Sequence, residues 1–289
     1  MTPALHRALP ALACLLLGFA DPAAGSLGLH DRRASAFDLP VSGRLVGVPA
    51  GGTLYVSWAD LRKLPVARLS LPNEFVPGAQ AVTAVFLGDL WKALPCGAGS
   101  DVLLATCDDG YASVFTREFI GRYRPFLVLE INGKGPDRWP LPGWAFNPGP
   151  YVILISSSVA PGADGILDAS HKKPWGVVRI EIGSLAERFR DFYGGPWAAL
   201  PPRGRNGRMI WINSCASCHR GPGGTFGGSK SRQSFLALQS LAVLHPAFFK
   251  SYVRNPRAMV PEATMPAHGH YTDDQLSDLV AFVTAGQRP

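Results

Sequence analysis

The sequence predicts two domains, an N-terminal α+β domain with a mixed sheet and a C-terminal domain built from helices. The chain has 289 residues, which is long enough for two cores, and 47% of them are hydrophobic. Between residues 37 and 183, short runs rich in Val, Ile, Leu and aromatic residues favour strands, with few helices between them. Beyond residue 203, apolar residues recur instead at helical spacing.

Seven strands and three short helices are expected in the first domain. Because strands and helices do not alternate regularly, a mixed sheet is expected rather than a doubly wound parallel one. Ser57 is the expected N-cap of the first helix. The strands are expected at residues 53–56, 67–71, 101–107, 111–115, 126–132, 151–156 and 176–182, and the helices at residues 58–64, 87–94 and 116–122.

Composition places the domain boundaries. Residues 36–183 form the expected α+β domain and residues 203–289 the expected helical domain. Residues 184–202 are rich in Gly and Pro and lack sustained periodicity, which is typical of a linker, although residues 185–192 could hold a short helix.

Residues 1–25 have the pattern of a secretory signal peptide. A weakly basic start precedes an apolar run at residues 8–20, too short to span a bilayer comfortably, and small residues precede Ser26. Cleavage after Ala20 is an alternative, whereas a lipid anchor on Cys14 is disfavoured because Ala11 stands where a lipobox prefers Leu. We therefore expect an exported, periplasmic protein that is soluble once this segment is removed.

The motif Cys215-Ala-Ser-Cys218-His219 is the attachment pattern of a c-type haem. The two thiols stand three positions apart, close to one helical turn, so both can face one side of a planar ligand. His219 is then placed to bind the iron as an axial ligand. A disulfide would not require His219, and a closed zinc site would need two further ligands, which no second motif supplies. The sequence predicts one covalent haem c.

The second axial ligand of the iron is expected in a Pro-rich loop at residues 255–266. Met265 is the strongest candidate, because thioether sulfur suits haem iron and a His/Met pair favours electron transfer. Met259, His268 and His270 compete for the same role.

A C-terminal helix is expected after this loop. Thr272 and Gln275 form the pattern of a capping box, apolar residues follow at three- and four-residue spacing, and Gly286 marks the end. Residues 235–244 carry a second apolar helical face. Between them and the motif, the Gly-rich residues 221–229 either approach the haem closely or form a loose loop.

With these motifs, residues 204–287 resemble class I c-type cytochromes. The resemblance implies an all-α fold in which a helix precedes the haem motif and a Met-Pro loop caps the iron. It also implies that the C-terminal helix crosses the first one, and that haem is attached outside the cytoplasm.

The N-terminal domain resembles the molybdopterin-binding domain of the sulfite oxidase family. The resemblance covers residues 37–182, through the segments Val56-Ser-Trp-Ala-Asp-Leu, Phe86-Leu-Gly-Asp-Leu-Trp and Val102-Leu-Leu-Ala-Thr-Cys-Asp-Asp-Gly-Tyr. It implies a molybdenum-binding role for Cys107, which follows a strand. A disulfide between Cys96 and Cys107, or two inert thiols, are the alternatives.

Two functions remain at this stage. The first is an exported monohaem cytochrome that transfers single electrons, with the front domain as a docking module. The second is a fused molybdopterin-dependent oxidoreductase whose haem relays electrons from a small substrate. The net charge of +7 fits an acidic redox partner, an anionic substrate or a role in solubility only. The basic residues are scattered, so no nucleic-acid partner is expected.

Overall fold

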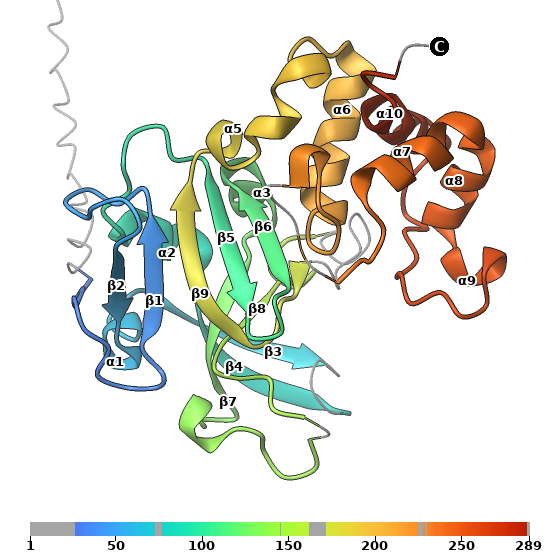
Figure 1. Ribbon diagram of the computed structural model, residues 1–289. Helices are drawn as coiled ribbons and strands as arrows, with labels where there is room; N and C mark the ends of the chain where they lie inside the picture. The colour runs from blue at the N-terminus through green and yellow to red at the C-terminus, as the bar shows by residue number, and fades with distance from the viewer. Residues whose placement is uncertain are drawn as a thin grey trace, which may run out of the picture.

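The computed structural model describes residues 27–72, 77–144, 146–161, 172–224, 228 and 230–287. The strands gather in one part of the molecule and helices α6 to α10 in the other, beside the first sheet (Figure 1). The expected signal peptide, residues 1–25, lies outside the described residues.

The first sheet has five strands in the order β2-β1-β9-β5-β6. Strands β1 and β9 pair in parallel and the other neighbours are antiparallel, so the sheet is mixed, as expected. These strands are β1 (Leu39–Gly43), β2 (Thr53–Val56), β5 (Val102–Cys107), β6 (Ala112–Thr116) and β9 (Val177–Gly183).

The second sheet is antiparallel, with strand order β3-β4-β7-β8. One core of buried residues joins both sheets and includes Leu103, Phe115 and Ile180 from the first and Leu127 and Ile153 from the second. The strands are β3 (Val66–Pro72), β4 (Ala79–Phe86), β7 (Phe126–Ile131) and β8 (Val152–Leu154), and the helices packed with them are α1 (Trp58–Leu61), α2 (Leu87–Ala93) and α3 (Arg117–Tyr123).

All seven expected strands are present, but two others were not predicted. Strand β1 contains Pro40, which lacks an N–H, and parallel pairing to β9 begins only at Val41. Strand β4 begins with Ala-Gln-Ala, residues with little strand preference. Ser57 caps α1 as expected, because its Oγ accepts from the Asp60 N–H at 3.0 Å, but the helix ends three residues early, at Leu61.

The helical part contains α6 (Pro202–Ile210), the π-helical segment η5 (Trp211–Cys215), α7 (Phe235–Leu244), α8 (Pro246–Arg254), α9 (Pro256–Met259) and α10 (Asp273–Val283). The capping box at α10 is confirmed: the Gln275 N–H donates to Thr272 Oγ1 at 3.2 Å and the Thr272 N–H donates to Gln275 Oε1 at 2.9 Å. Helix α8 was not predicted, and α9 interrupts the segment expected to be a loop.

Helices α6 and α10 cross at Gly207. A Cβ atom at this position would lie 1.9 Å from the backbone oxygen of Asp278, so only glycine allows the observed approach. One turn further on, the rings of Trp211 and Phe282 lie 6.1 Å apart between their centroids. The crossing is the one that the resemblance to class I cytochromes implies.

The short helix considered for residues 185–192 is present as α5 (Leu185–Arg188), and the rest of residues 184–202 differs from the expected linker because it contains two short 3-10 turns. Phe189 and Phe192 are each 1% exposed and belong to the core of the helical part. That core also includes Val102 and Val114 from the first sheet. The high Gly and Pro content of this stretch predicted a linker, although Phe189 and Phe192 are buried in a core. The two parts of the chain therefore share one apolar interface.

No helix among the described residues is long and apolar enough to cross a membrane.

Candidate haem site

The cysteine motif lies at the end of a continuous helical run. Helix α6 continues into η5, and the Cys218 and His219 N–H groups both donate to the Cys215 carbonyl, at 3.1 and 2.8 Å. The motif is thus one tight turn, as its spacing predicts. Both cysteines are free thiols, and burial raises the pKa of Cys215 to about 12. Neither thiol is therefore ionised at neutral pH.

An aromatic wall stands beside the motif. Trp211 is 2% exposed, and its ring lies 5.9 Å from the His219 ring and 5.1 Å from Phe235 between centroids. The hydroxyls of Ser214 and Tyr271 are hydrogen-bonded, which links η5 to the segment before α10. The motif is therefore held by contacts with Phe235 on α7 and with Tyr271 before α10.

The four candidates for the second axial position lie in different surroundings. Met265 is half-buried and packs against the apolar core that Cys215 also contacts, whereas Met259 is 40% exposed on α9. His268 is 2% exposed, and the rings of His268 and His270 lie 6.0 and 4.1 Å from Tyr271. Of the two candidate methionines, Met265 is thus the one that packs against the same core as the motif, and its role as ligand stays a prediction.

The backbone after the motif folds back onto it. The Gly228 N–H donates to the Ala216 carbonyl at 2.8 Å, and the Ser231 N–H donates to the Cys218 carbonyl at 3.0 Å. A Cβ at Gly228 would lie 1.9 Å from the Ser217 oxygen, so glycine is needed for this approach. The described part of this Gly-rich segment thus packs against the backbone of the motif, and its expected approach to the haem stays a prediction.

Lys230 connects the motif region to the N-terminal domain. Its ammonium lies 2.7 Å from the Asp109 carboxylate, in the turn between β5 and β6. Asp109 and Lys230 are far apart in the sequence, and the fold brings them together beside the motif.

The residues around the motif fit a haem. A c-type haem needs two thiols for its thioether bonds and an imidazole for its iron, and the motif supplies all three groups. Trp211 Nε1 and Ser217 Oγ are both buried, and neither has a hydrogen-bond partner among the described residues. Buried polar atoms are normally hydrogen-bonded. A group with acceptor oxygens, such as a haem propionate, would satisfy the indole N–H.

The surroundings of Cys107 do not fit a molybdenum centre. Its side chain is 3% exposed in the core between the sheets, and burial together with Asp109 and Asp108 raises its pKa to about 12. Cys96 and Cys107 are both free thiols, so the disulfide alternative is wrong.

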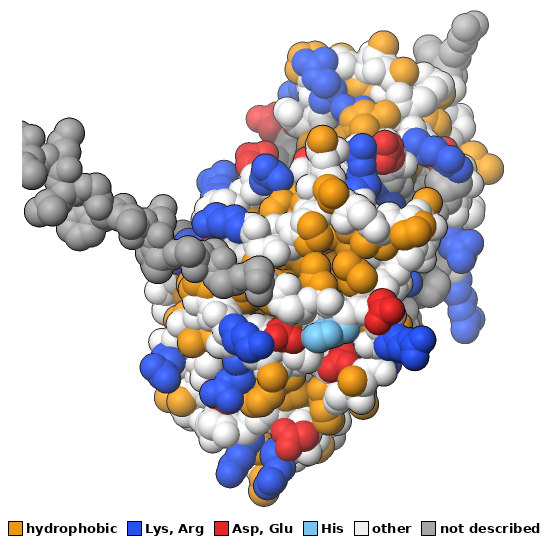
Figure 2. Space-filling view, turned by 90° about the vertical axis from the view of Figure 1, so that its left-hand side faces the viewer, with side chains coloured by type: hydrophobic (Ala, Val, Ile, Leu, Met, Phe, Trp, Pro, Cys, Tyr) orange, Lys and Arg blue, Asp and Glu red, His pale blue; other side chains and the backbone are white. Residues whose placement is uncertain are grey.

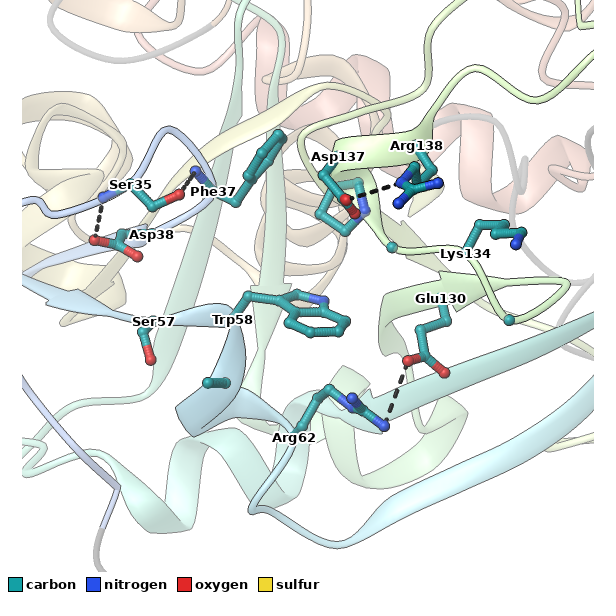
Figure 3. A pocket seen from close by; sticks show the side chains of 14 residues that line it. Ser35, Phe37, Asp38, Ser57, Trp58, Arg62, Glu130, Lys134, Asp137 and Arg138 are labelled. Atoms are coloured by element: carbon teal, nitrogen blue, oxygen red, sulfur yellow. Dashed lines mark hydrogen bonds and ion pairs between the residues drawn. The ribbon is translucent and has the colours of Figure 1, made fainter.

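A separate pocket of about 650 Å³ lies in the N-terminal domain and does not include Cys107. Trp58 lies in it, between the Arg62–Glu130 pair at 3.5 Å and the Asp137–Arg138 pair at 3.3 Å (Figure 3). Both arginines are engaged by carboxylates, so the pocket shows no preference for an anion.

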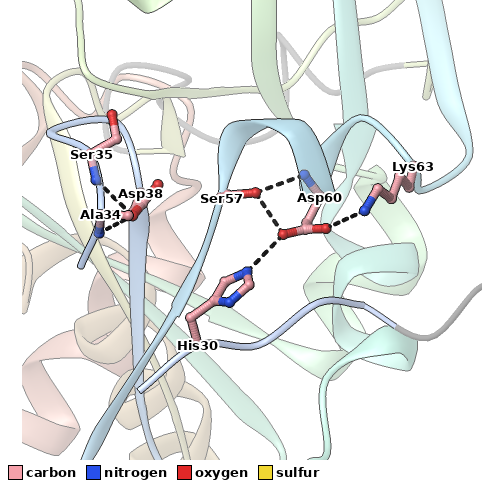
Figure 4. Close-up of polar contacts among 7 residues, drawn as sticks. All are labelled: His30, Ala34, Ser35, Asp38, Ser57, Asp60 and Lys63. Carbon is pink, nitrogen blue, oxygen red and sulfur yellow. Dashed lines mark hydrogen bonds and ion pairs between the residues drawn. The ribbon is translucent and has the colours of Figure 1, made fainter. Parts of the chain in front are cut away.

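Asp60 ties the start of the described chain to α1 (Figure 4). Its buried carboxylate accepts from Lys63 at 2.6 Å, from Ser57 Oγ at 2.6 Å and contacts His30 Nε2 at 2.9 Å. Hydrogen bonds from Lys63, Ser57 and His30 hold the pKa of Asp60 well below its usual range. These three partners give Asp60 a structural role.

Comparisons with known proteins agree with the geometry of the helical part. Residues 202–283 match the family described as cytochrome C oxidase, cbb3-type, subunit III. No curated protein sequence matches the chain. The sulfane dehydrogenase SoxCD from Paracoccus pantotrophus is a similar solved structure, with 13% identity and a TM-score of 0.36 over 55% of this chain.

The chain covers only 42% of that SoxCD chain, and at this TM-score no property is carried over from it. The N-terminal domain is described by its own mixed sheet. The family match, the cysteine motif and the crossing of α6 and α10 agree on the other part: residues 202–283 are a cytochrome c domain.

Proposed function

We propose that the chain is an exported electron-transfer protein that carries one haem c, bound covalently through Cys215 and Cys218. His219 and Met265 would hold its iron. The observation that carries the proposal is the tight turn of the motif at the end of α6, beside a buried indole N–H without a described partner. The cytochrome c match over residues 202–283 supports the same function.

The bound haem would supply a one-electron ferric/ferrous couple. The protein would exclude water from the haem and supply the side chains that bind its iron. Trp211, Phe235 and Phe282 are each 6% exposed or less and form an apolar wall near His219. A dry environment and a soft thioether both favour the ferrous state, which raises the reduction potential.

The N-terminal domain acts in this proposal as a docking and scaffold module. Its first sheet contributes Val102, Leu104 and Val114 to the core of the cytochrome domain, so it stiffens the region next to the motif. The fused molybdopterin enzyme remains the alternative, but no observation favours it, because Cys107 lies in an apolar core away from the pocket.

Export and the partner also belong to the proposal. Residues 1–25 would direct the chain to the periplasm, where haem c is attached according to the resemblance. The net charge of +7 suits an acidic redox protein as partner. On the face seen in Figure 2, Lys and Arg side chains are scattered among hydrophobic areas rather than gathered in one patch. Such a face suits a protein partner better than nucleic acid.

A spectroelectrochemical titration tests the electron-transfer function. The haem-loaded protein should show one reversible one-electron wave and, when oxidised, the weak red-edge band of ferric haem bound to Met. Met265→Ala should lose this band and lower the potential by on the order of 100 mV, because axial ligands set potentials over a range of about 0.8 V.

Met259→Ala is the matched control and should keep both the band and the potential, since Met259 is exposed. Survival of the band in Met265→Ala would move the ligand assignment to Met259. Absence of the band in the unmodified protein would favour a His ligand or an open site, and an open site would point to ligand binding rather than electron transfer.

A further inference from the structure

Lys172 is a buried cation between the two domains. It is 1% exposed, and its ammonium donates to the Val114 carbonyl on β6 and to Asn213 Oδ1 on η5, the latter at 3.5 Å. It also lies over the rings of Phe115 and Phe119, at 5.4 and 4.9 Å from their centroids. The side chain thus reaches from the N-terminal domain to the segment that carries the haem motif.

No carboxylate among the described residues balances this charge. Strand β6 has no charged residue, and on α3 Arg117 and Glu118 are exposed and Arg122 lies over Tyr123. On α6, Arg208 donates to the carbonyls of Phe192 and Trp197. Lysine is almost never fully buried unless it is paired.

Burial accordingly lowers the pKa of Lys172 to about 7. An ordinary lysine keeps its proton far above neutral pH, whereas this one can hold or release it there with little change in conditions. Both protonation states of the side chain are thus accessible near neutrality.

The Lys172 ammonium lies close to the segment that carries the haem motif. Asn213 stands two residues before Cys215, and its Nδ2 donates to the Met209 carbonyl at 2.9 Å, which holds the amide in place. One amide side chain therefore separates the ammonium from the haem-bearing turn. Because the surroundings are apolar, the charge of the Lys172 ammonium and the charge of a haem bound to the motif are poorly screened from each other.

We infer that reduction of the haem is coupled to protonation of Lys172, so that the cytochrome takes up a proton together with its electron. The inference rests on the proposed function. One electron from the donor protein converts ferric to ferrous iron, and one proton from solvent converts the Lys172 amine to an ammonium. The electron makes the haem more negative, which favours the ammonium and raises the lysine pKa in the ferrous state.

The sign of the pH dependence follows. Below both pKa values Lys172 is charged in both redox states, and the potential lies on its upper plateau. Above both it is neutral, and the potential lies on a lower plateau. Between them the potential falls with rising pH, by at most a tenfold change in the ferric/ferrous ratio per pH unit, about 59 mV. We expect this window around neutral pH.

The test is the midpoint potential of the full-length haem protein from pH 5 to 9. Lys172→Met keeps the apolar stem and removes the charge, so its potential should stay near the lower plateau across the window. Lys173→Met, one residue away and only half-buried, should keep the unmodified curve. A Lys172→Met curve that still follows the unmodified protein would overturn the inference.

A second measurement covers a variant that fails to fold. The unmodified protein, reduced near pH 7 in weakly buffered solution with an indicator dye, should take up a measurable fraction of a proton per electron, and Lys172→Gln should take up less. Absence of uptake in the unmodified protein contradicts the coupling. A chain that carries no haem fails the proposed function instead, so the two failures are distinguishable.

Discussion

Replacing Cys215 and Cys218 together with alanine is expected to leave the chain without covalent haem. The two thioether bonds need these sulfur atoms, and the described residues place no other cysteine in the motif turn. The expected loss is complete, as measured by haem staining after denaturing electrophoresis and by the absorbance of the native protein. Each single variant should retain some haem through the remaining thioether.

The chain offers a matched control for this experiment. Cys96→Ala with Cys107→Ala removes two other thiols, both free and remote from the motif turn in sequence. This variant should stain for haem like the unmodified protein. Haem staining that persists in the Cys215/Cys218 variant and disappears in the control would place the attachment site elsewhere.

Gly207→Ala is expected to destabilise the cytochrome domain strongly. The new Cβ would lie 1.9 Å from the Asp278 oxygen and 2.8 Å from Phe282 Cβ, so α6 and α10 must move apart. Overpacking of this kind costs about 3 kcal/mol. For a domain of this size, that corresponds to a fall in melting temperature of roughly 12 to 24 °C.

Gly121→Ala is the matched control, because Gly121 also lies in a helix but nothing surrounds its Cβ position within 4 Å. Alanine there should be neutral or stabilise by up to about 1 kcal/mol. Thermal unfolding followed by circular dichroism measures both variants. Equal melting temperatures for the two would show that the α6–α10 contact is not tight.

The features that could be predicted from the sequence are those set by local chemistry. The capping box of Thr272 and Gln275 depends on hydrogen bonds within one turn, and the Cys215-to-His219 spacing depends on helical geometry alone. Most strands were found for the same reason, since runs of branched and aromatic residues favour extended structure.

The features that were missed depend on contacts distant in sequence or on signals that were available but unused. Helix α8 begins with Pro246 and places Phe249 and Val253 four residues apart, a recognisable start and stripe. Strand β1 is held by neighbours on both sides despite Pro40.

The site itself shows the same division. The motif and Met265 were visible in the sequence, whereas Lys172 and the Asp109–Lys230 pair were not. A lysine is normally exposed, and nothing local marks Lys172 as 1% exposed. Its contacts come from β6 and α3 of the N-terminal domain and from Asn213 on η5, all distant from it in the sequence.

The proposed function depends on a single haem bound covalently to the motif turn. Mass spectrometry of the purified full-length protein tests it most directly, after export in a host that matures c-type cytochromes, removal of free haem with acid acetone, and proteolysis. We expect one haem-sized addition on the peptide that carries Cys215 and Cys218, and none on the peptides that carry Cys96 or Cys107. Unmodified Cys215 and Cys218 in a protein whose colour is lost to acid acetone would contradict the account.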